Sequence, residues 1–188
     1  MGDGLYGFLK IKTMASQVVT EKTKKFLKLY GSQIASAISD SGLFFPAVVG
    51  QKCNESGYGT SDLAKLYNNF GGIKGRPKEA IGTTSNGWAI FRTPEDCFRS
   101  YARFITTLPQ YSKALKSSSP EEQIKELVKG GYCEINKNKK SRGYMPSPEY
   151  YLNICQGAID VTRDTIRTGR ISRTNLLSTI STIKTNTI

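Results

Sequence analysis

The sequence predicts one α+β domain that is mainly helical and contains a single short β-hairpin. Segments with helical spacing of apolar residues follow Ser-Pro or Thr-Pro pairs and acidic residues, which is the pattern of helix starts. The dipeptide Asn86-Gly87 stands between two short runs that favour β-structure. A chain of 188 residues is long enough for one domain with its own hydrophobic core.

Three helices are predicted in the first part of the chain. Over residues 16–39, apolar side chains recur at helical spacing and lysines occupy the opposite face. Pro46 suits the first turn of a second helix, and Gly57 suits the position just after its end. A third, short helix is expected over residues 62–67, and the glycine- and asparagine-rich residues 68–77 are expected to be irregular.

The second part of the chain is predicted to contain the hairpin and three more helices. A two-residue type I′ turn at Asn86-Gly87 is expected to join the two strands. Helices are expected to begin at TPED (93–96), SPEE (119–122) and SPE (147–149), where a capping hydroxyl, a proline and acids occur in order. A basic loop, residues 134–146, separates the last two helices.

The domain is predicted to span residues 16–167, with a further segment at each end. Residues 1–15 are glycine-rich and are expected to form a loosely held N-terminal lead-in. Residues 168–188 are rich in Thr, Ser and Ile, and are expected to form a tail that is loosely ordered or docks on another chain.

The charge of the chain indicates an anionic partner. It carries 27 Lys and Arg against 15 Asp and Glu, which gives a net charge of +12. Nucleic acid, an anionic membrane surface and an anionic cell-wall polymer all fit this balance, as does a basic surface that serves solubility. No helix-turn-helix, zinc-finger or base-stacking pattern supports nucleic acid, and no apolar run is long enough to span a membrane.

The absence of histidine narrows the possible chemistry. Without histidine, Ser-His-Asp and Cys-His sites are excluded and the commonest zinc ligand is missing. No cofactor and no metal are expected. The four cysteines lack metal or redox spacing and are expected to be reduced and mostly buried, with two disulfides as the alternative: Cys53, Cys97, Cys133 and Cys155.

Glu55 is the candidate catalytic acid. It stands in the last turn of the predicted second helix, where the negative end of the helix dipole disfavours an ionised carboxylate. Apolar neighbours such as Tyr58, Phe70 or Ile73 would act in the same direction. A carboxyl group that keeps its proton near neutral pH suits the general acid of glycosidic bond cleavage. An ordinary solvated glutamate at a helix end is the alternative.

The residues that follow Glu55 resemble a known family. The string ESGYGTSDLAK (55–65), followed by YNNFGGIKG (67–75), is similar to the catalytic signature of the glucosaminidase family, glycoside hydrolase family 73. That family includes bacterial autolysins and the peptidoglycan hydrolase domain of the flagellar rod cap. Three later stretches resemble the family in the same order, so that the resemblance covers roughly residues 30–160: FRTPEDCFRSYARFI, PQYSKAL and GGYCEINKNKKSRGYMPSPEYYLNI.

The resemblance implies a lysozyme-like fold and cleavage of the β-1,4 bond between N-acetylglucosamine and N-acetylmuramic acid in peptidoglycan. Glu55 takes the position of the family's general acid. Tyr150 matches the tyrosine near the family's cleft, although Tyr151 or Tyr132 would fit the same role, and core packing is the alternative for each. Expected substrate contacts, with turn formation as the alternative for Asn69, are Tyr58, Asn68, Asn69, Phe70, Tyr132 and Tyr151.

The sequence departs from the family at the second acid. Many members carry a carboxylate on the hairpin shortly before its Asn-Gly turn, whereas this chain has IGTTS there. Glu79, at the foot of the first strand, is the nearest acid and the candidate for that role. Without a placed second carboxylate, neither retention nor inversion is assigned. The substrate's 2-acetamido group acting as nucleophile, or a water positioned by Tyr150, would replace it.

The sequence therefore predicts a peptidoglycan hydrolase whose partners are glycan strands and anionic cell-wall polymers. Two alternatives stay open: a peptidoglycan-docking structural protein, such as a phage tail component, and a lytic transglycosylase or muramidase on the same fold. The N-terminal residues lack the apolar stretch of a secretory signal, which suits a bacteriophage endolysin or virion-borne lysin acting on the bacterial cell wall. An autolysin exported by other means is the alternative.

Overall fold

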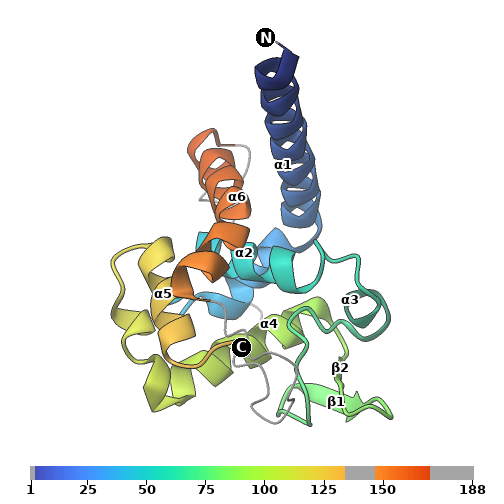
Figure 1. The fold of residues 1–188 in the computed structure, drawn as a ribbon. Helices are drawn as coiled ribbons and strands as arrows, with labels where there is room; N and C mark the ends of the chain where they lie inside the picture. The colour runs from blue at the N-terminus through green and yellow to red at the C-terminus, as the bar shows by residue number, and fades with distance from the viewer. Residues whose placement is uncertain (1–2, 134–146, 170–188) are drawn as a thin grey trace, which may run out of the picture.

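The computed structural model describes residues 3–133 and 147–169, with side chains from residue 16 onward. Helices dominate this part of the chain, and a two-stranded antiparallel sheet lies at one side of the body (Figure 1). The elements are α1 (Asp3–Ile38), α2 (Phe45–Glu55), α3 (Asp62–Tyr67), β1 (Ala80–Thr83), β2 (Ala89–Phe91), α4 (Pro94–Thr107), α5 (Pro120–Lys129) and α6 (Pro148–Arg167), with single 3-10 turns at Pro109–Tyr111 and Ala114–Lys116. The predicted basic loop and most of the predicted tail lie outside the described residues.

The predicted starts of α4, α5 and α6 are confirmed. Thr93, Ser119 and Ser147 each precede a helix with proline in its first turn, and each side chain accepts a hydrogen bond from the backbone N–H three residues on. Ser61 caps α3 in the same way. At α4 the cap is reciprocal, because the Asp96 carboxylate accepts from the N–H of Thr93 at 3.1 Å. These hydrogen bonds satisfy amide groups that have no partner within the helix.

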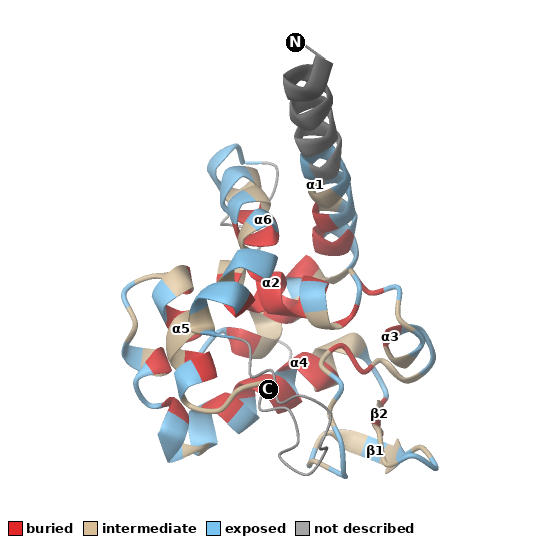
Figure 2. Ribbon diagram, viewed as in Figure 1, coloured by how far each residue is buried: buried red, intermediate tan, exposed pale blue. Residues whose placement is uncertain are grey.

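The centre of the body is α2. Its residues Ala47–Cys53 are all buried, and the helix packs against α1, α5 and α6. Figure 2 shows the buried residues concentrated on α2 and on the turns of α1 and α4 near it. Gly50 allows α6 to approach closely, because a Cβ at this position would lie 2.9 Å from Cγ1 of Ile159. The core is therefore built around the helix that ends at Glu55.

Phe70 anchors the irregular segment after α3 to this core. Its ring centroid lies 4.7 Å from that of Tyr30 and 6.2 Å from that of Phe26, both on α1. On the other side it lies 5.1 Å from the ring of Phe98 on α4. Such tilted and edge-on aromatic pairs stabilise beyond the area they bury. The segment therefore has a fixed position beside the end of α2.

The first helix is longer than predicted. It begins at Asp3 and continues without a break through residue 15, so the predicted boundary between lead-in and domain lies inside a helix. The segment contains no proline, and each residue added to an existing helix gains a backbone hydrogen bond. The N-terminal end of α1 projects from the body (Figure 1). None of the helices in the described ranges, α1 included, has the length and hydropathy needed to cross a bilayer.

The hairpin is present, but the predicted type I′ turn is wrong. That turn needs positive φ at both central residues, and here Gly87 has φ 77° whereas Asn86 does not have positive φ. The N–H of Gly87 donates to the carbonyl of Thr84 at 2.9 Å, and the N–H of Thr84 donates to the carbonyl of Trp88 at 2.8 Å. The strands are therefore joined by a longer turn in which glycine alone takes the left-handed conformation.

The four cysteines are free thiols, as the expectation of a reduced state requires. Cys53, Cys97 and Cys155 are buried, and Cys133 is half-buried. Burial raises the pKa of both Cys97 and Cys133 to about 11. These thiols are therefore weak nucleophiles near neutral pH.

Candidate active site

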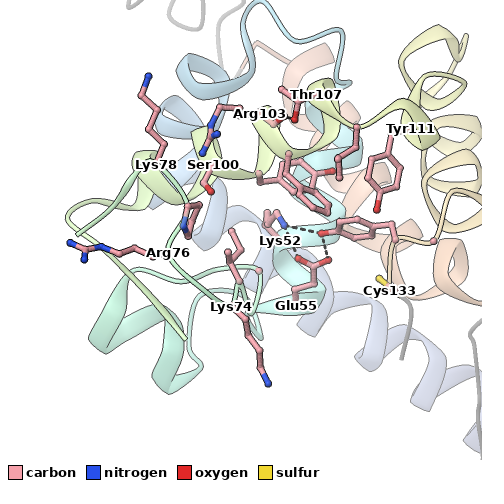
Figure 3. A pocket seen from close by; sticks show the side chains of 18 residues that line it. Lys52, Glu55, Lys74, Arg76, Lys78, Ser100, Arg103, Thr107, Tyr111 and Cys133 are labelled. Atoms are coloured by element: carbon pink, nitrogen blue, oxygen red, sulfur yellow. Dashed lines mark hydrogen bonds and ion pairs between the residues drawn. The ribbon is translucent and has the colours of Figure 1, made fainter. Parts of the chain in front are cut away.

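A pocket of about 920 Å³ opens beside the C-terminal end of α2 (Figure 3). The end of α2, the segment 71–78, α4 with the turn after it, and residues 131–133 line it. The aromatic lining residues are Tyr101, Phe104, Tyr111 and Tyr132. The basic lining residues are Lys52, Lys74, Arg76, Lys78 and Arg103. Among the described residues of the lining, Glu55 supplies the sole carboxylate.

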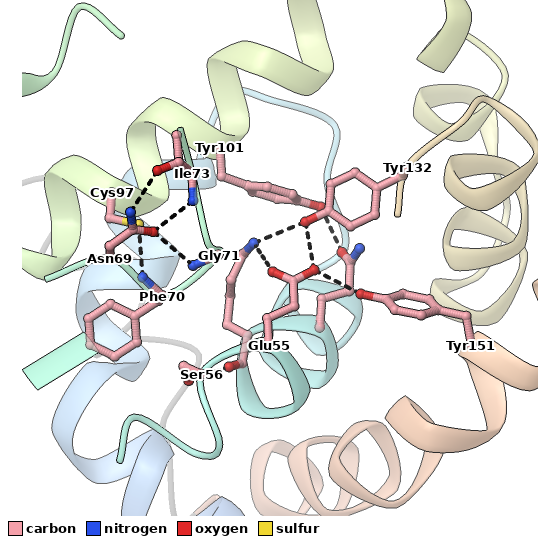
Figure 4. A network of polar contacts seen from close by, with 12 residues as sticks. Glu55, Ser56, Asn69, Phe70, Gly71, Ile73, Cys97, Tyr101, Tyr132 and Tyr151 are labelled. Carbon is pink, nitrogen blue, oxygen red and sulfur yellow. Dashed lines mark hydrogen bonds and ion pairs between the residues drawn. The ribbon is translucent and has the colours of Figure 1, made fainter. Parts of the chain in front are cut away.

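Three polar side chains hold the carboxylate of Glu55 (Figure 4). Its Oε1 accepts hydrogen bonds from the hydroxyl of Tyr132 at 2.7 Å and from that of Tyr151 at 2.8 Å. Its Oε2 lies 2.7 Å from the Nζ of Lys52. The Glu55 side chain is 14% exposed, so the carboxylate is fixed in orientation and still borders the pocket.

Lys52 brings a buried positive charge to the site. Its side chain is 1% exposed, and its Nζ lies 3.2 Å from the hydroxyl of Tyr132 and 3.9 Å from the ring centroid of Tyr101. A cation at ion-pair distance and two hydroxyl donors stabilise the ionised form of a carboxylate. Lys52, Tyr132 and Tyr151 therefore complement negative charge on the Glu55 side chain.

The tyrosine hydroxyls around Glu55 are neutral donors. Burial raises the pKa of Tyr132 and of Tyr151, and the nearby Glu55 carboxylate raises both further. The same two causes raise the pKa of Tyr101, whose hydroxyl donates to Oε1 of Gln51 at 2.6 Å. These hydroxyls therefore keep their protons at physiological pH and do not act as bases in the free protein.

The turn after α2 fixes the position of Glu55. The hydroxyl of Ser56 donates to the carbonyl one turn back and accepts from the N–H of Gly59 at 2.8 Å. Gly57 and Tyr58 have φ of 56° and 59°, which confirms Gly57 as the residue just after the helix. Positive φ is uncommon for a residue with a Cβ, so Tyr58 is held there by the surrounding turn. The chain therefore reverses directly after Glu55.

Two asparagines shape the segment that forms one wall of the pocket. Asn69 is buried, and its Nδ2 donates to the carbonyls of Ile73 at 2.8 Å and Ala89 at 3.0 Å. Its Oδ1 accepts from the N–H of Ile73 at 2.9 Å. Asn68 ends α3 with φ 51° and donates to the carbonyl of Phe91 at 3.1 Å. Both side chains tie the segment to β2, and Asn69 takes the role of turn formation.

The structure brings together three of the predicted site residues: Glu55, Tyr132 and Tyr151. Tyr150, the preferred tyrosine of the sequence prediction, is 49% exposed, whereas the hydroxyl of the next residue, Tyr151, donates to Glu55. Of the six predicted substrate contacts, Tyr132 alone is in the lining. Tyr151 lies behind the lining and contacts Glu55. The other four belong to the surrounding scaffold: Tyr58, Asn68, Asn69 and Phe70.

Glu79 is bound to Arg103 rather than placed across the pocket from Glu55. Its Oε1 lies 2.8 Å from Nε of Arg103, and its Oε2 lies 2.7 Å from Nη2. Burial raises the pKa of Glu79, but the hydrogen bonds from Arg103 and Ser100 outweigh burial and hold it below its ordinary value. Glu79 is not part of the lining, whereas Arg103 is. Its visible role is to orient that guanidinium.

Sequence reasoning missed Lys52 and Tyr101. Lys52 stands three residues before Glu55 on the same helix, so both side chains share one face. The signal that could reveal Lys52 is its place among the otherwise uncharged residues 47–53, which are buried, because a buried lysine needs a partner of opposite charge. Tyr101 is a buried residue of α4 that reaches the site through its ring. Its role depends on where α4 packs against α2, and no pattern within one segment of the sequence predicts that contact.

The pocket combines one proton-transfer group, the carboxyl group of Glu55, with walls suited to a ligand ring that has apolar faces. A carboxylate at the edge of a pocket can exchange a proton with a bound ligand. The aromatic side chains offer apolar faces, and the polar groups fix orientation. Within the described part of the chain, no cluster of three Cys, Asp or Glu side chains is placed to hold a metal ion.

Residues 31–159 match the glucosaminidase family, described as mannosyl-glycoprotein endo-beta-N-acetylglucosaminidase. No curated protein sequence matches the chain. The glycoside hydrolase domain of FlgJ from Salmonella typhimurium is 17% identical with a TM-score of 0.57, covering 85% of this chain and 98% of that one. A peptidoglycan hydrolase from Sphingomonas sp. A1 is 19% identical with a TM-score of 0.57, covering 79% of this chain and 97% of that one. A chain of a type VI secretion system effector-immunity complex from Pseudomonas protegens is 20% identical with a TM-score of 0.56, covering 76% of this chain and 94% of that one.

At these identities the solved structures show the fold alone, and they confirm the predicted lysozyme-like domain with one short hairpin. The family match covers well over half of the chain, including all the residues around Glu55 that carry the sequence resemblance. The chain therefore belongs to the glucosaminidase family, glycoside hydrolase family 73, and is a glycoside hydrolase of the endo-β-N-acetylglucosaminidase type.

Proposed function

We propose that this enzyme acts on the bacterial cell wall and hydrolyses the β-1,4 bond between N-acetylglucosamine and N-acetylmuramic acid, with Glu55 as general acid. One observation carries the proposal: the Glu55 carboxylate borders the pocket and is oriented there by Lys52, Tyr132 and Tyr151. Two proteins of the same fold support the wall as substrate, since they are described as a peptidoglycan hydrolase and a glycoside hydrolase domain.

The pocket walls suit a strand of N-acetyl sugars. Phe104 and the half-buried Tyr132 present rings on which the apolar faces of pyranoses can pack. The buried rings of Tyr101 and Tyr111 pack behind them. Phe104 is 48% exposed, so part of its ring is available to a ligand. A strand held against these rings brings a glycosidic oxygen toward the end of α2, where the carboxyl group of Glu55 lies.

In the first step, Glu55, having taken up a proton from water, gives that proton to the bridging oxygen as the bond from that oxygen to C1 breaks. Negative charge then develops on the carboxylate. The ammonium of Lys52 and the hydroxyls of Tyr132 and Tyr151 are already in place to stabilise this charge. Preorganised donors of this kind lower the barrier because they need no reorganisation during the reaction.

The role of nucleophile, which a second carboxylate fills in most retaining glycosidases, falls to the substrate itself. Glu55 is the sole carboxylate in the described lining, and Glu79 is bound to Arg103. We infer that the carbonyl oxygen of the 2-acetamido group bonds to C1 as the leaving oxygen departs. Water then attacks C1, breaks that bond and returns a proton to Glu55. Substrate-assisted glycosidases use this route and retain the anomeric configuration.

A lytic transglycosylase is the second candidate, because a single acid also suffices for it. In that reaction a hydroxyl of the substrate attacks C1 in place of water, so the product carries an anhydro ring instead of a free reducing end. The same carboxylate would deliver the proton.

Product analysis tests the proposal and separates the candidates. Purified peptidoglycan is digested with the wild-type enzyme and, in parallel, with Glu55→Gln, and the borohydride-reduced fragments are identified by mass spectrometry. The proposal predicts reduced N-acetylglucosamine ends in the wild-type digest only. Reduced N-acetylmuramic acid ends would show a muramidase, and anhydro-muramic ends a transglycosylase. Intact peptidoglycan in the wild-type digest would show a docking protein.

A further inference from the structure

Four cations form one side of the pocket and are called here the basic rim: Lys74, Arg76, Lys78 and Arg103. Three come from the short stretch KGRPK (74–78), and the fourth comes from α4. All four side chains are exposed. Figure 3 shows Arg76 and Lys78 on the opposite side of the pocket from Tyr111 and Cys133, with their charged ends extending outward.

The charges of the basic rim are not balanced within the pocket. Glu55 is the sole carboxylate among the described lining residues, and it is paired with Lys52 at 2.7 Å. Glu79 binds Arg103 from behind with both oxygens, which holds the guanidinium in place. Among the side chains of residues 16–133 and 147–169, Arg76 and Lys78 have no ion-pair partner. A concave surface lined by one sign of charge concentrates ions of the opposite sign.

The sugars of a peptide-bearing strand are uncharged, because the lactyl carboxyl group of N-acetylmuramic acid is amidated there, and they give no reason for such a rim. We propose that the basic rim binds the carboxylates of the peptides attached to the glycan strand, so that the enzyme selects peptide-bearing strands over peptide-free ones. The inference rests on the proposed function. Peptides branch from every second sugar and point away from the glycan axis, toward side chains that extend outward as these do. Guanidinium groups bind carboxylates through paired hydrogen bonds.

Phosphate is the other anion that this chemistry would accept, since some walls carry phosphate-rich polymers on the same glycan. Peptide carboxylates fit the pocket better, because they occur next to every scissile bond, whereas the polymers are attached at few of them. The rim lies in the same pocket as Glu55 and would meet an anion each time a strand is seated.

The test compares binding of matched ligands to a protein that does not turn them over. Glu55→Gln, with its fold checked by circular dichroism, is titrated by calorimetry with three soluble glycan ligands. These are peptide-bearing strands, the same strands after an amidase has removed the peptides, and peptide-free strands that keep the phosphate polymer. The rim variant adds Arg76→Gln and Lys78→Gln. The control adds Lys113→Gln and Lys116→Gln, two exposed lysines outside the lining.

We expect the rim variant to bind peptide-bearing strands about 10-fold more weakly, which corresponds to two exposed ionic contacts. Its binding to peptide-free strands should weaken less, because the amidase leaves only the lactyl carboxylate on each N-acetylmuramic acid, and the control variant should match its parent. An equal loss on all ligands, no loss, or a loss that follows the phosphate polymer would overturn the proposal. Hydrolysis by the wild-type enzyme is measured separately. If the enzyme hydrolyses the strands but its binding does not depend on the peptides, the inference about the basic rim is wrong and the proposed function stands. If binding depends on the peptides but no hydrolysis occurs, the proposed function is wrong and the inference about the rim stands.

Discussion

The Nζ of Lys52 lies 2.7 Å from Oε2 of Glu55, and the two side chains come from the same face of α2. Lys52 is buried, whereas Glu55 borders the pocket. Removing one partner of a buried pair leaves an uncompensated charge in a region of low dielectric. The carboxyl group that we propose as the general acid therefore also contributes to the stability of the fold.

The first prediction concerns this pair. Lys52→Met and Glu55→Gln should each lower the free energy of unfolding by about 1–3 kcal/mol, since each leaves a charge or a polar group unpaired. The double variant removes both charges and should lose less than the sum of the single losses. Urea denaturation of the four proteins measures the coupling. Losses that simply add would contradict a stabilising pair.

The second prediction separates two neighbouring tyrosines. Tyr151→Phe removes a 2.8 Å hydrogen bond to Glu55 Oε1 and should slow hydrolysis about 10-fold, together with a stability loss of about 1 kcal/mol. Tyr150→Phe is the matched control, since it removes the hydroxyl of the neighbouring tyrosine, which is 49% exposed. Rates of reducing-end release measure both variants. A larger loss for Tyr150→Phe would instead support Tyr150 as the tyrosine that acts in the site.

The third prediction concerns stereochemistry. If the substrate's 2-acetamido group takes the place of a second carboxylate, the product first appears as the β-anomer. Proton NMR of a soluble glycan fragment, recorded before mutarotation, measures the anomer directly. Initial release of the α-anomer would instead show direct attack by water and would require a base that the described lining does not contain.

The fourth prediction concerns pH and Glu79. Its pKa is below the ordinary value in the folded protein, so its bond to Arg103 contributes stability that is present above the unfolded pKa of about 4.3. That contribution is lost as the pH falls through the lower, folded value. Glu79→Gln should therefore be less stable than the wild type at pH 7, and the difference should shrink toward pH 3. Thermal melting across this range measures it, and a constant difference would contradict the assignment.

The fifth prediction concerns the thiols. Because Cys53, Cys97 and Cys155 are buried and burial raises their pKa, a thiol reagent should label them only slowly in the folded protein at pH 7.5. All four cysteines should react at once in urea. Reductants should leave activity unchanged. Fast labelling of the folded protein, or loss of activity on reduction, would contradict the buried free thiols.

Local hydrogen bonding explains which parts of the fold the sequence could predict. Helix starts such as Thr93 and Ser119 depend on a side chain and an amide three residues apart, so the pattern lies within one short stretch. The hairpin turn was misassigned because Asn-Gly fits both a two-residue turn and a longer one. Which turn forms depends on the pairing of the strands, including the irregularity between Ala80 and Gly82.

The site was predictable only in part, because its groups come from distant segments. Glu55 was identified by its family signature and its position at a helix end. Tyr132 and Tyr151 reach it from 77 and 96 residues away, and no local pattern fixes that meeting. Adjacent residues on a helix point about 100° apart, so one step in sequence decides whether a tyrosine of α6 faces Glu55 or solvent. That step is the difference between Tyr150 and Tyr151.

The rate of reducing-end release by Glu55→Gln tests the central claim most directly. Glu21→Gln, which changes an exposed glutamate on α1, is the matched control for loss of one charge. With both variants shown to be folded, the account predicts a fall of roughly 10²–10⁴-fold in kcat for Glu55→Gln and an unchanged rate for the control. Hydrolysis by Glu55→Gln at the wild-type rate would contradict the role of this carboxyl group as the acid.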